Sequence, residues 1–378
     1  MKTINSIAFF SDNFPPRVGG VSTFSYQLAF YFHQYRPDLK VMMNVFDRKK
    51  YTFESSLPMT FPLQRYRTPK RWQQFISTLR ACWRCRKYDV FHVTTLFPEA
   101  GFVALACLLL GKKFFLTVYG TEVVTRRGSR LTKWLKRFAL SCATAVLSFS
   151  KATAAAMHQQ FPLTKIKTVV IYPGIQQPKV TNRATLRSRI GFADDDIVVL
   201  FVGRFVKRKG AADLIQAIAL CSNKKIKALL VGNGEEMAEL RQLTTELNLD
   251  DRIIFTGSVP FETVGDYYQA SDIFTMPSFF ESGEEDVEGL GLVYLEAQSL
   301  GLPVIGTTSG GIPEAIADGR SGYVIPERDV ARLAECIRIL STNKDLYEKM
   351  SENARIFVKE SFSWMQTVEG HEKIYSNA

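Results

Sequence analysis

Short apolar runs alternate along the chain with stretches of helical periodicity. Apolar runs bounded by polar or glycine residues are typical of buried strands in parallel sheets, and the helical stretches between them are typical of crossover helices. A first series of strands is predicted over 6–10, 40–46, 90–94, 113–118, 144–148 and 168–172. A second series is predicted over 197–202, 228–231, 253–256, 273–276, 303–306 and 322–325. Helices are predicted over 21–35, 211–221, 235–247, 294–300, 331–340 and 364–375.

Two such series in succession predict an α/β protein with two doubly wound, Rossmann-like parallel-sheet domains facing a central cleft. A length of 378 residues is also too great for one ordinary core. The Pro- and Gly-containing segment Tyr172–Pro178 marks the link between the domains. We expect a first domain over 1–172, a linker over 173–182 and a second domain over 183–360.

Charge divides the chain at the same place. The formal net charge is +11, but residues 1–176 hold 26 Lys and Arg against 7 Asp and Glu, whereas residues 177–378 hold 22 against 30. A basic half of this kind suits an anionic partner. The composition, with 46% hydrophobic and 22% charged residues, is that of a folded protein.

Several classes of protein are not expected. No signal peptide is visible, and no segment reaches the ~20 apolar residues that span a bilayer. The six cysteines are scattered, which suits a reducing cytoplasm, and the four histidines are too dispersed to suggest a metal site. Cys82 and Cys85 have redox-motif spacing, but they lie within a helix-patterned stretch where packing is the simpler interpretation.

Glycine-rich loops follow three predicted strands. Gly19 and Gly20 precede a helix, where backbone amides can approach an anion. Arg204 and Lys209 stand in a loop after a strand, where cations can clamp a diphosphate, although a solvated basic loop would look the same. The most informative segment is Glu288–Glu296, in which a glycine turn opens a helix between two carboxylates that can each accept sugar hydroxyls.

Taken in order, these segments resemble the retaining glycosyltransferases of family 4, which have the GT-B fold. The resemblance rests on the Gly19-Gly20 loop, the loop from Gly203 to Gly210, the Glu288…Glu296 pair and the turn Gly310-Gly311-Ile312-Pro313-Glu314. The run from Asp286 to Gln298 is similar to that of bacterial phosphatidylinositol mannosyltransferases. The resemblance implies a hexosyltransferase, and a C-terminal helix, about 361–378, that crosses back to pack on the first domain.

The resemblance also implies roles for individual residues. Arg204 and Lys209 would neutralise the diphosphate of a sugar nucleotide, Glu288 would hold hydroxyls of the donor sugar, and Glu296 would bind the ribose. Tyr119 stands where the family usually has a histidine near the reacting sugar, and it is counted with Arg204, Lys209 and Glu288 as a catalytic candidate; it can donate a hydrogen bond to a hydroxyl but cannot carry a positive ring. Glu122, three residues on, matches an acidic position of the family or starts a helix. The implied substrate-binding residues are Gly19, Gly20, Gly120, Gly203, Gly234, Val259, Gly289, Leu290, Gly291, Leu292 and Glu296.

On this interpretation the acceptor attacks the sugar on the face that the diphosphate leaves, and the enzyme mainly stabilises charge on the leaving group. No cofactor and no metal are expected, because no Asp-x-Asp cluster stands at the site. GDP-mannose is favoured as the donor over UDP-linked sugars, and a lipid-linked or glycan acceptor is expected. The alternatives are an epimerase or hydrolase of sugar nucleotides, a non-catalytic GT-B protein and a nucleic-acid-binding protein. No nucleic-acid motif supports the last of these.

Two basic segments also carry aromatic residues at helical spacing. Lys70–Lys87 contains Trp72 and Trp83, and the second segment, 126–137, contains Trp134. The apolar residues alone are explained by core packing, but the surrounding cations are typical of helices that bind anionic membrane surfaces. We therefore expect a cytoplasmic enzyme that associates peripherally with the inner face of the membrane.

Overall fold

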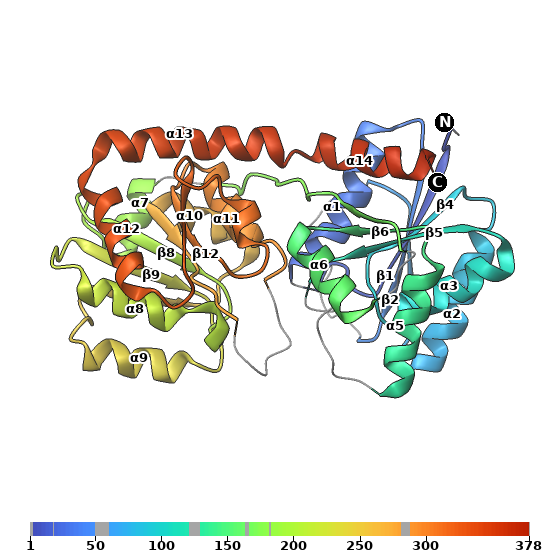
Figure 1. Ribbon diagram of the computed structural model, residues 1–378, viewed down its shortest axis with the longest axis horizontal. Helices are drawn as coiled ribbons and strands as arrows, with labels where there is room; N and C mark the ends of the chain where they lie inside the picture. Colours follow the sequence, from blue (N-terminus) through green and yellow to red (C-terminus); the bar gives the residue numbers. More distant parts are fainter. Residues whose placement is uncertain are drawn as a thin grey trace. The chain divides into compact units, whose positions relative to one another are not determined.

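The computed structural model describes residues 3–17, 19–49, 60–120, 129–162, 166–180, 183–280 and 288–377. The chain forms two compact units (Figure 1). Unit 1 comprises Met1–Gly174 together with Ser363–Ala378, and unit 2 comprises Ile175–Phe362. Each unit is built on one parallel sheet, so the prediction of two Rossmann-like α/β domains is confirmed.

The sheet of unit 1 has the strand order β3-β2-β1-β4-β5-β6-β7, and every neighbouring pair is parallel. The direction of strand succession reverses between β1 and β4, which creates a topological switch point. The strands are β1 (Ser6–Ser11), β2 (Lys40–Asp47), β3 (Leu63–Arg67), β4 (Val90–Val93), β5 (Lys113–Val118), β6 (Ala145–Ser148) and β7 (Thr168–Val170).

Alternate residues of each strand point to opposite faces of this sheet, and both faces are apolar. Helices therefore cover both faces. Ile7 and Phe9 of β1 face a core shared with α1 and α14, whereas Ala8 and Phe10 face a core shared with α2, α3 and α5. The helices of unit 1 are α1 (Gly20–Tyr35), α2 (Arg71–Arg84), α3 (Glu99–Leu110), α5 (Arg130–Cys142), α6 (Lys151–Gln160) and α14 (Trp364–Ser376).

The C-terminal helix α14 completes the core of unit 1, as the resemblance implied. Trp364 stacks on Tyr31 with ring centroids 4.8 Å apart, and the Tyr375 hydroxyl bonds to Nδ1 of His92. His371 stacks beside His92, and burial lowers the pKa of His371 to about 4. Both histidines are therefore neutral at physiological pH, since burial also lowers the pKa of His92.

The sheet of unit 2 has the order β10-β9-β8-β11-β12-β13, with its switch point between β8 and β11. The strands are β8 (Ile197–Val202), β9 (Ile226–Val231), β10 (Ile253–Gly257), β11 (Ile273–Thr275), β12 (Val304–Thr307) and β13 (Gly322–Ile325). The α-helices are α7 (Arg183–Ile190), α8 (Ala211–Leu220), α9 (Met237–Glu246), α10 (Val264–Ala270), α11 (Leu292–Ser299), α12 (Val330–Thr342) and α13 (Lys344–Ser361). Short 3-10 turns occur at η1 (Lys207–Lys209), η2 (Phe261–Thr263) and η3 (Ile312–Ala315).

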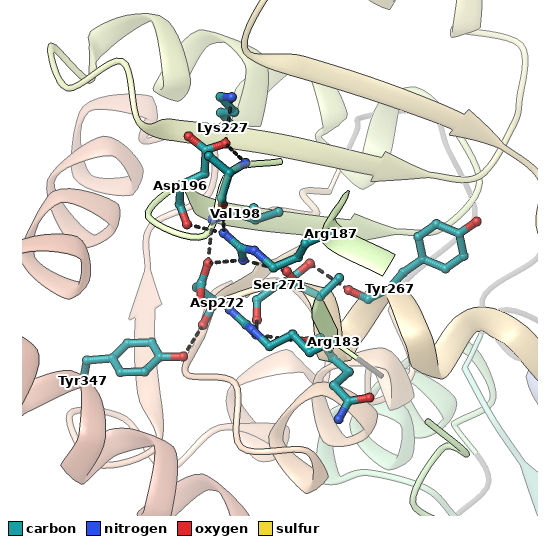
Figure 2. A network of polar contacts seen from close by, with 12 residues as sticks. Arg183, Arg187, Asp196, Val198, Lys227, Tyr267, Ser271, Asp272 and Tyr347 are labelled. Carbon is teal, nitrogen blue, oxygen red and sulfur yellow. Dashed lines mark hydrogen bonds and ion pairs between the residues drawn. The ribbon is translucent and has the colours of Figure 1, made fainter. Parts of the chain in front are cut away.

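A buried polar network attaches α7 to the amino ends of β8 and β11 (Figure 2). The Asp272 carboxylate accepts hydrogen bonds from Arg183 at 2.6 Å, from Arg187 at 3.2 Å and from the Val198 amide at 2.8 Å. Arg187 also donates to three backbone carbonyls. The network fixes α7, the first helix of unit 2, against the amino ends of these two strands.

Candidate functional site

The loop that follows β8 carries the predicted cations. Gly203 and Arg204 come directly after the strand, Arg204 is exposed, and the chain then makes the 3-10 turn η1 that ends at Lys209. This loop lies at the carboxyl end of β8, next to the switch point of the sheet. Ligands of doubly wound sheets bind at such a position.

Lys209 forms an ion pair with Glu288, which lies in the turn before α11. A second cation, Arg208, lies 3.6 Å from the same carboxylate oxygen. The exposed fractions of these side chains are low, at 12% for Lys209, 7% for Arg208 and 15% for Glu288. The structure therefore brings together two of the predicted site residues, and it adds Arg208 to them.

The turn from Glu288 to Gly291 leads into α11. Gly291 adopts a left-handed conformation with φ 81°, and no side chain caps the first amides of the helix. The turn packs against the backbone of a second loop, because the Gly311 amide donates to the Glu288 carbonyl at 2.9 Å. A Cβ at Gly311 would lie 2.1 Å from the Gly289 carbonyl oxygen, so this approach requires glycine. Leu290 is buried, and Gly289 and Leu292 are half-buried.

Glu296 lies in α11, eight positions after Glu288, and accepts a hydrogen bond from the Tyr268 hydroxyl at 2.8 Å. Burial raises the pKa of Glu296 to about 7, while the Tyr268 hydrogen bond opposes the shift. The carboxyl consequently changes charge near neutral pH. A half-buried group with this property is suited to accept hydroxyl hydrogen bonds when it is ionised.

Gly234 and Val259 follow the two strands beyond β8 in the sheet. Gly234 comes after β9, and a Cβ there would lie 2.2 Å from the Phe205 carbonyl oxygen. The loops after β8 and β9 are further joined by a bond from the Phe205 amide to the Asn233 carbonyl at 3.0 Å. Val259 is half-buried just after β10. These residues therefore line the same carboxyl edge as Arg204 and Lys209.

The remaining predicted residues belong to unit 1. Gly19 and Gly20 are exposed at the start of α1, where no side chain caps the helix. Tyr119 follows β5 and is 9% exposed, with its ring against Phe24 and Phe149 at centroid distances of 5.8 and 4.6 Å. Its ring is thus part of the core of unit 1. Gly120 follows it with φ 132°, and Glu122 lies outside the described residues.

Comparison with known proteins decides the family. Residues 18–177 match the model described as Glycosyltransferase Family 4, and residues 182–357 match the model described as Glycosyl transferases group 1. The chain belongs to the family 4 glycosyltransferases. This confirms the family to which the sequence was assigned by resemblance.

Among the relatives of this glycosyltransferase is N-acetyl-alpha-D-glucosaminyl L-malate synthase of Bacillus anthracis, 29% identical over 76% of this chain and 74% of the relative. A GDP-mannose-dependent monoacylated alpha-(1-6)-phosphatidylinositol monomannoside mannosyltransferase of Corynebacterium glutamicum is 35% identical over 48% of each chain. The match thus spans about half the length of that relative. The crystal structure of Anabaena HepE in complex with UDP has a TM-score of 0.80 at 21% identity, covering 99% of this chain and all of HepE. It supports the GT-B fold.

Two residues of the candidate site in this glycosyltransferase were missed by sequence reasoning. Arg208 stands between two lysines, and the sequence does not show which of the three cations turns inward. Tyr268 lies in α10 without any motif, and only the fold places its hydroxyl on Glu296. Across the described ranges, no group of three or more His, Cys, Asp or Glu side chains forms a candidate metal site.

Proposed function

We propose that this glycosyltransferase is a retaining hexosyltransferase that uses a nucleotide-diphosphate sugar and a lipid-linked or glycan acceptor. The observation that carries the proposal is the convergence of Arg208 and Lys209 on Glu288 at the start of α11. In this arrangement, fixed cations stand beside backbone amides that no side chain caps, as a leaving diphosphate requires.

The residues would act mainly through electrostatics. Lys209, together with Arg204 and the amides from Gly289 to Leu292, would stabilise the negative charge that grows on the leaving diphosphate. Glu288 would accept donor-sugar hydroxyls and Glu296 those of the ribose. The sugar–phosphate bond breaks as the acceptor oxygen bonds to the same face of the sugar, and the leaving phosphate takes the acceptor's proton.

Replacing Lys209 tests this assignment. We expect Lys209→Ala to lower the rate of sugar transfer ~10²–10³-fold, by analogy with the removal of one oxyanion donor. Lys207→Ala is the matched control, since Lys207 is an exposed cation on the same turn. Transfer of radiolabelled sugar from GDP-mannose or UDP-glucose to a polar lipid extract measures both. Equal rates for the two variants would remove Lys209 from the diphosphate site. Nucleotide released without any acceptor would instead favour a hydrolase.

The donor is proposed to be GDP-mannose. The mannosyltransferase relative is named as GDP-mannose-dependent, whereas the Anabaena structure contains UDP. Thermal shift with GDP, UDP and ADP separates these donors, because a ligand at 100 times its dissociation constant stabilises the protein by ~2.7 kcal/mol. If UDP stabilises the protein and GDP does not, GDP-mannose is excluded as the donor.

Three neighbouring helices of unit 1 are proposed to dock on the inner face of the membrane. α3 lies beside both α2 and α5 on one side of the sheet (Figure 1). Core packing does not account for their large apolar side chains, of which Trp72, Trp83, Trp134 and Leu109 are 58–76% exposed. The exposed cations on these helices and just after the end of α2 are Arg71, Arg80, Arg84, Arg86, Lys87, Arg130, Lys133 and Arg137.

Exposed tryptophan and leucine beside cations match an anionic lipid surface, at ~1 kcal/mol per cation near the surface. Across the described residues, no helix combines the length and apolar character needed to cross a bilayer. Co-sedimentation with neutral and anionic vesicles tests the docking. Changing Arg80, Arg84, Arg86 and Lys87 to Ser should abolish the preference for anionic vesicles. A control that changes Lys224, Lys344, Lys349 and Lys359 of unit 2 to Ser should retain it. Equal binding to both vesicle types by the unmodified protein would refute the proposal.

A further inference from the structure

The Glu296 carboxylate of α11 is held by a tyrosine that a ligand cannot reach. Tyr268 of α10 donates its hydroxyl hydrogen to Oε2 of Glu296 at 2.8 Å. The Tyr268 side chain is completely buried, whereas Glu296 is half-buried. Any effect of Tyr268 on a bound ligand is therefore exerted through Glu296.

The other carboxylate oxygen, Oε1, is available to a ligand. No described residue donates a hydrogen bond to it, and it is not one of the buried oxygen atoms that lack a partner. The two oxygens of an ionised carboxylate offer about four acceptor positions, so the bond from Tyr268 leaves enough of them for two hydroxyl groups. One oxygen of Glu296 is thus held by the protein, while the other can accept hydrogen bonds from a ligand.

Tyr268 is itself fixed in place. Its ring packs against that of Phe274 in β11, with the ring centroids 5.8 Å apart. The end of α10 is bound by two arginines of α7, because Arg183 and Arg187 donate to three of its backbone carbonyls at 2.6, 2.8 and 2.9 Å (Figure 2). The Tyr268 hydroxyl therefore has a defined position, and the bond that it makes restricts the rotamers of the flexible Glu296 side chain.

The hydrogen bond also favours the ionised form of Glu296. Burial raises the pKa of Glu296 to about 7, and the Tyr268 hydroxyl opposes that shift. Burial, followed by the nearby Glu296 charge, raises the pKa of Tyr268 well above its usual range, so Tyr268 keeps its proton and remains a donor. An ionised carboxylate accepts stronger hydrogen bonds than a neutral one. Loss of the Tyr268 hydroxyl would therefore raise the pKa of Glu296 and make it a weaker acceptor near neutral pH.

We propose that Tyr268 is a positioning residue that orients the Glu296 carboxylate toward the ribose hydroxyls of the nucleotide and so sets the preference of the site for a ribonucleotide. This inference rests on the proposed transferase function, in which Glu296 binds the ribose, and makes it more specific. Tyr268 does not touch the nucleotide. It holds the carboxylate in place before the nucleotide binds, so less conformational entropy is lost on binding. A nucleotide without ribose hydroxyls gains nothing from this arrangement.

Tyr268→Phe removes the hydroxyl and keeps the buried ring. Titration calorimetry with GDP and with 2′,3′-dideoxy-GDP, which lacks both ribose hydroxyls, measures the preference; UDP and its dideoxy analogue replace them if UDP is the nucleotide that stabilises the protein. We expect the wild type to bind GDP about 10–100-fold more tightly than the analogue, the effect of hydrogen bonds to a charged group. Tyr268→Phe should lower this ratio about 3–10-fold by weakening the binding of GDP alone.

The same variant should change the pH profile and one kinetic constant. The rise in GDP affinity with pH should move to higher pH, because Glu296 ionises at higher pH without the Tyr268 hydroxyl. KM for the nucleotide sugar should rise with kcat unchanged, since the ribose contact is the same in the ground state and the transition state. A loss of structure alone would not produce this combination.

Two further variants serve as controls. Tyr347→Phe removes a tyrosine hydroxyl of unit 2 that donates to the Asp272 carbonyl at 3.1 Å (Figure 2), and it should keep the wild-type ratio and pH profile. Glu296→Gln should itself lower the ratio. Adding Tyr268→Phe to Glu296→Gln should lower it no further, because Tyr268 acts through the carboxylate.

The outcomes separate this inference from the transferase function. A wild-type ratio and pH profile in Tyr268→Phe would overturn the positioning role. Equal losses of affinity for GDP and its dideoxy analogue would also overturn it, because they would indicate a structural effect. If the wild type transfers sugar but binds both nucleotides equally, Glu296 does not bind the ribose, and the inference fails while the transferase function stands. A wild type that binds neither GDP nor UDP and transfers no sugar would refute the transferase function, and the inference with it.

Discussion

Replacement of Asp272 by alanine is expected to destabilise unit 2 strongly. The variant removes the carboxylate that pairs with Arg187, whose side chain is only 3% exposed, and leaves the Val198 amide without its acceptor. Breaking a buried ion pair by removing one partner costs ~3–5 kcal/mol, because the remaining charge stays buried. For a unit of this size, that loss corresponds to a fall in the thermal midpoint of roughly 6–20 °C.

Circular dichroism during urea and thermal unfolding measures the effect. All four tryptophans, at positions 72, 83, 134 and 364, belong to unit 1, so their fluorescence follows that unit alone. Comparison of the two signals shows whether the loss is confined to unit 2. The matched control is Asp195→Ala, which removes an exposed, solvent-screened pair with Lys225 and should leave the stability nearly unchanged. A loss for Asp272→Ala no larger than that of the control would refute the reasoning from burial.

Three further predictions concern pH and loop packing. Nucleotide affinity should rise about tenfold from pH 6 to pH 8 as Glu296, with its pKa of about 7, ionises. Titration calorimetry on Glu296→Gln should show no such rise, and an equal rise there would point to another group. The pKa of His371 is about 4 in the folded protein and about 6.5 in the unfolded chain, so the unfolded chain takes up a proton first as the pH falls. The resulting contribution to stability, about 3 kcal/mol, is fully present above pH ~6.5 and is lost as the pH falls toward 4. The thermal midpoint of His371→Gln should therefore decline less between pH 7 and pH 4 than that of the wild type, and parallel declines would contradict this. Gly234→Ala should cost ~1–3 kcal/mol and weaken nucleotide binding, because its Cβ would meet the Phe205 carbonyl. A thermal midpoint and an affinity equal to those of the wild type would show that the loops can separate freely.

The fold was predictable because buried parallel strands are apolar on both faces and therefore appear in the sequence as continuous apolar runs. β8 and β13 match their predicted bounds. β3 was missed, because Leu63–Arg67 is an edge strand with two arginines and a glutamine and lacks an apolar run. The residues that α14 contacts could not be predicted from the sequence either, since Tyr375 bonds to His92, 283 positions away, and Trp364 stacks on the still more distant Tyr31.

The candidate site was predictable only where a motif marks it. The Glu288…Glu296 spacing and the loop before Lys209 could be recognised from the sequence, and the roles given to their residues stay predictions. The sequence did not show the inward turn of Arg208 toward Glu288, because that turn depends on tertiary packing. Core packing was also the simpler interpretation of the aromatic residues in the basic segments. The exposure of Trp72, Trp83 and Trp134 shows that it was wrong for these three.

The return of α14 to unit 1 affects how the protein is synthesised. Unit 1 is interrupted by the whole of unit 2, so its core lacks Trp364 and Tyr375 until unit 2 has been translated. At roughly 5–20 residues per second, synthesis of unit 2 takes about 10–40 s. During that interval the apolar surface around Phe24, Tyr31 and Phe32 is not covered by α14. Chaperones can bind this exposed surface of the nascent chain. Unit 2, which is continuous in sequence, can complete its own core first.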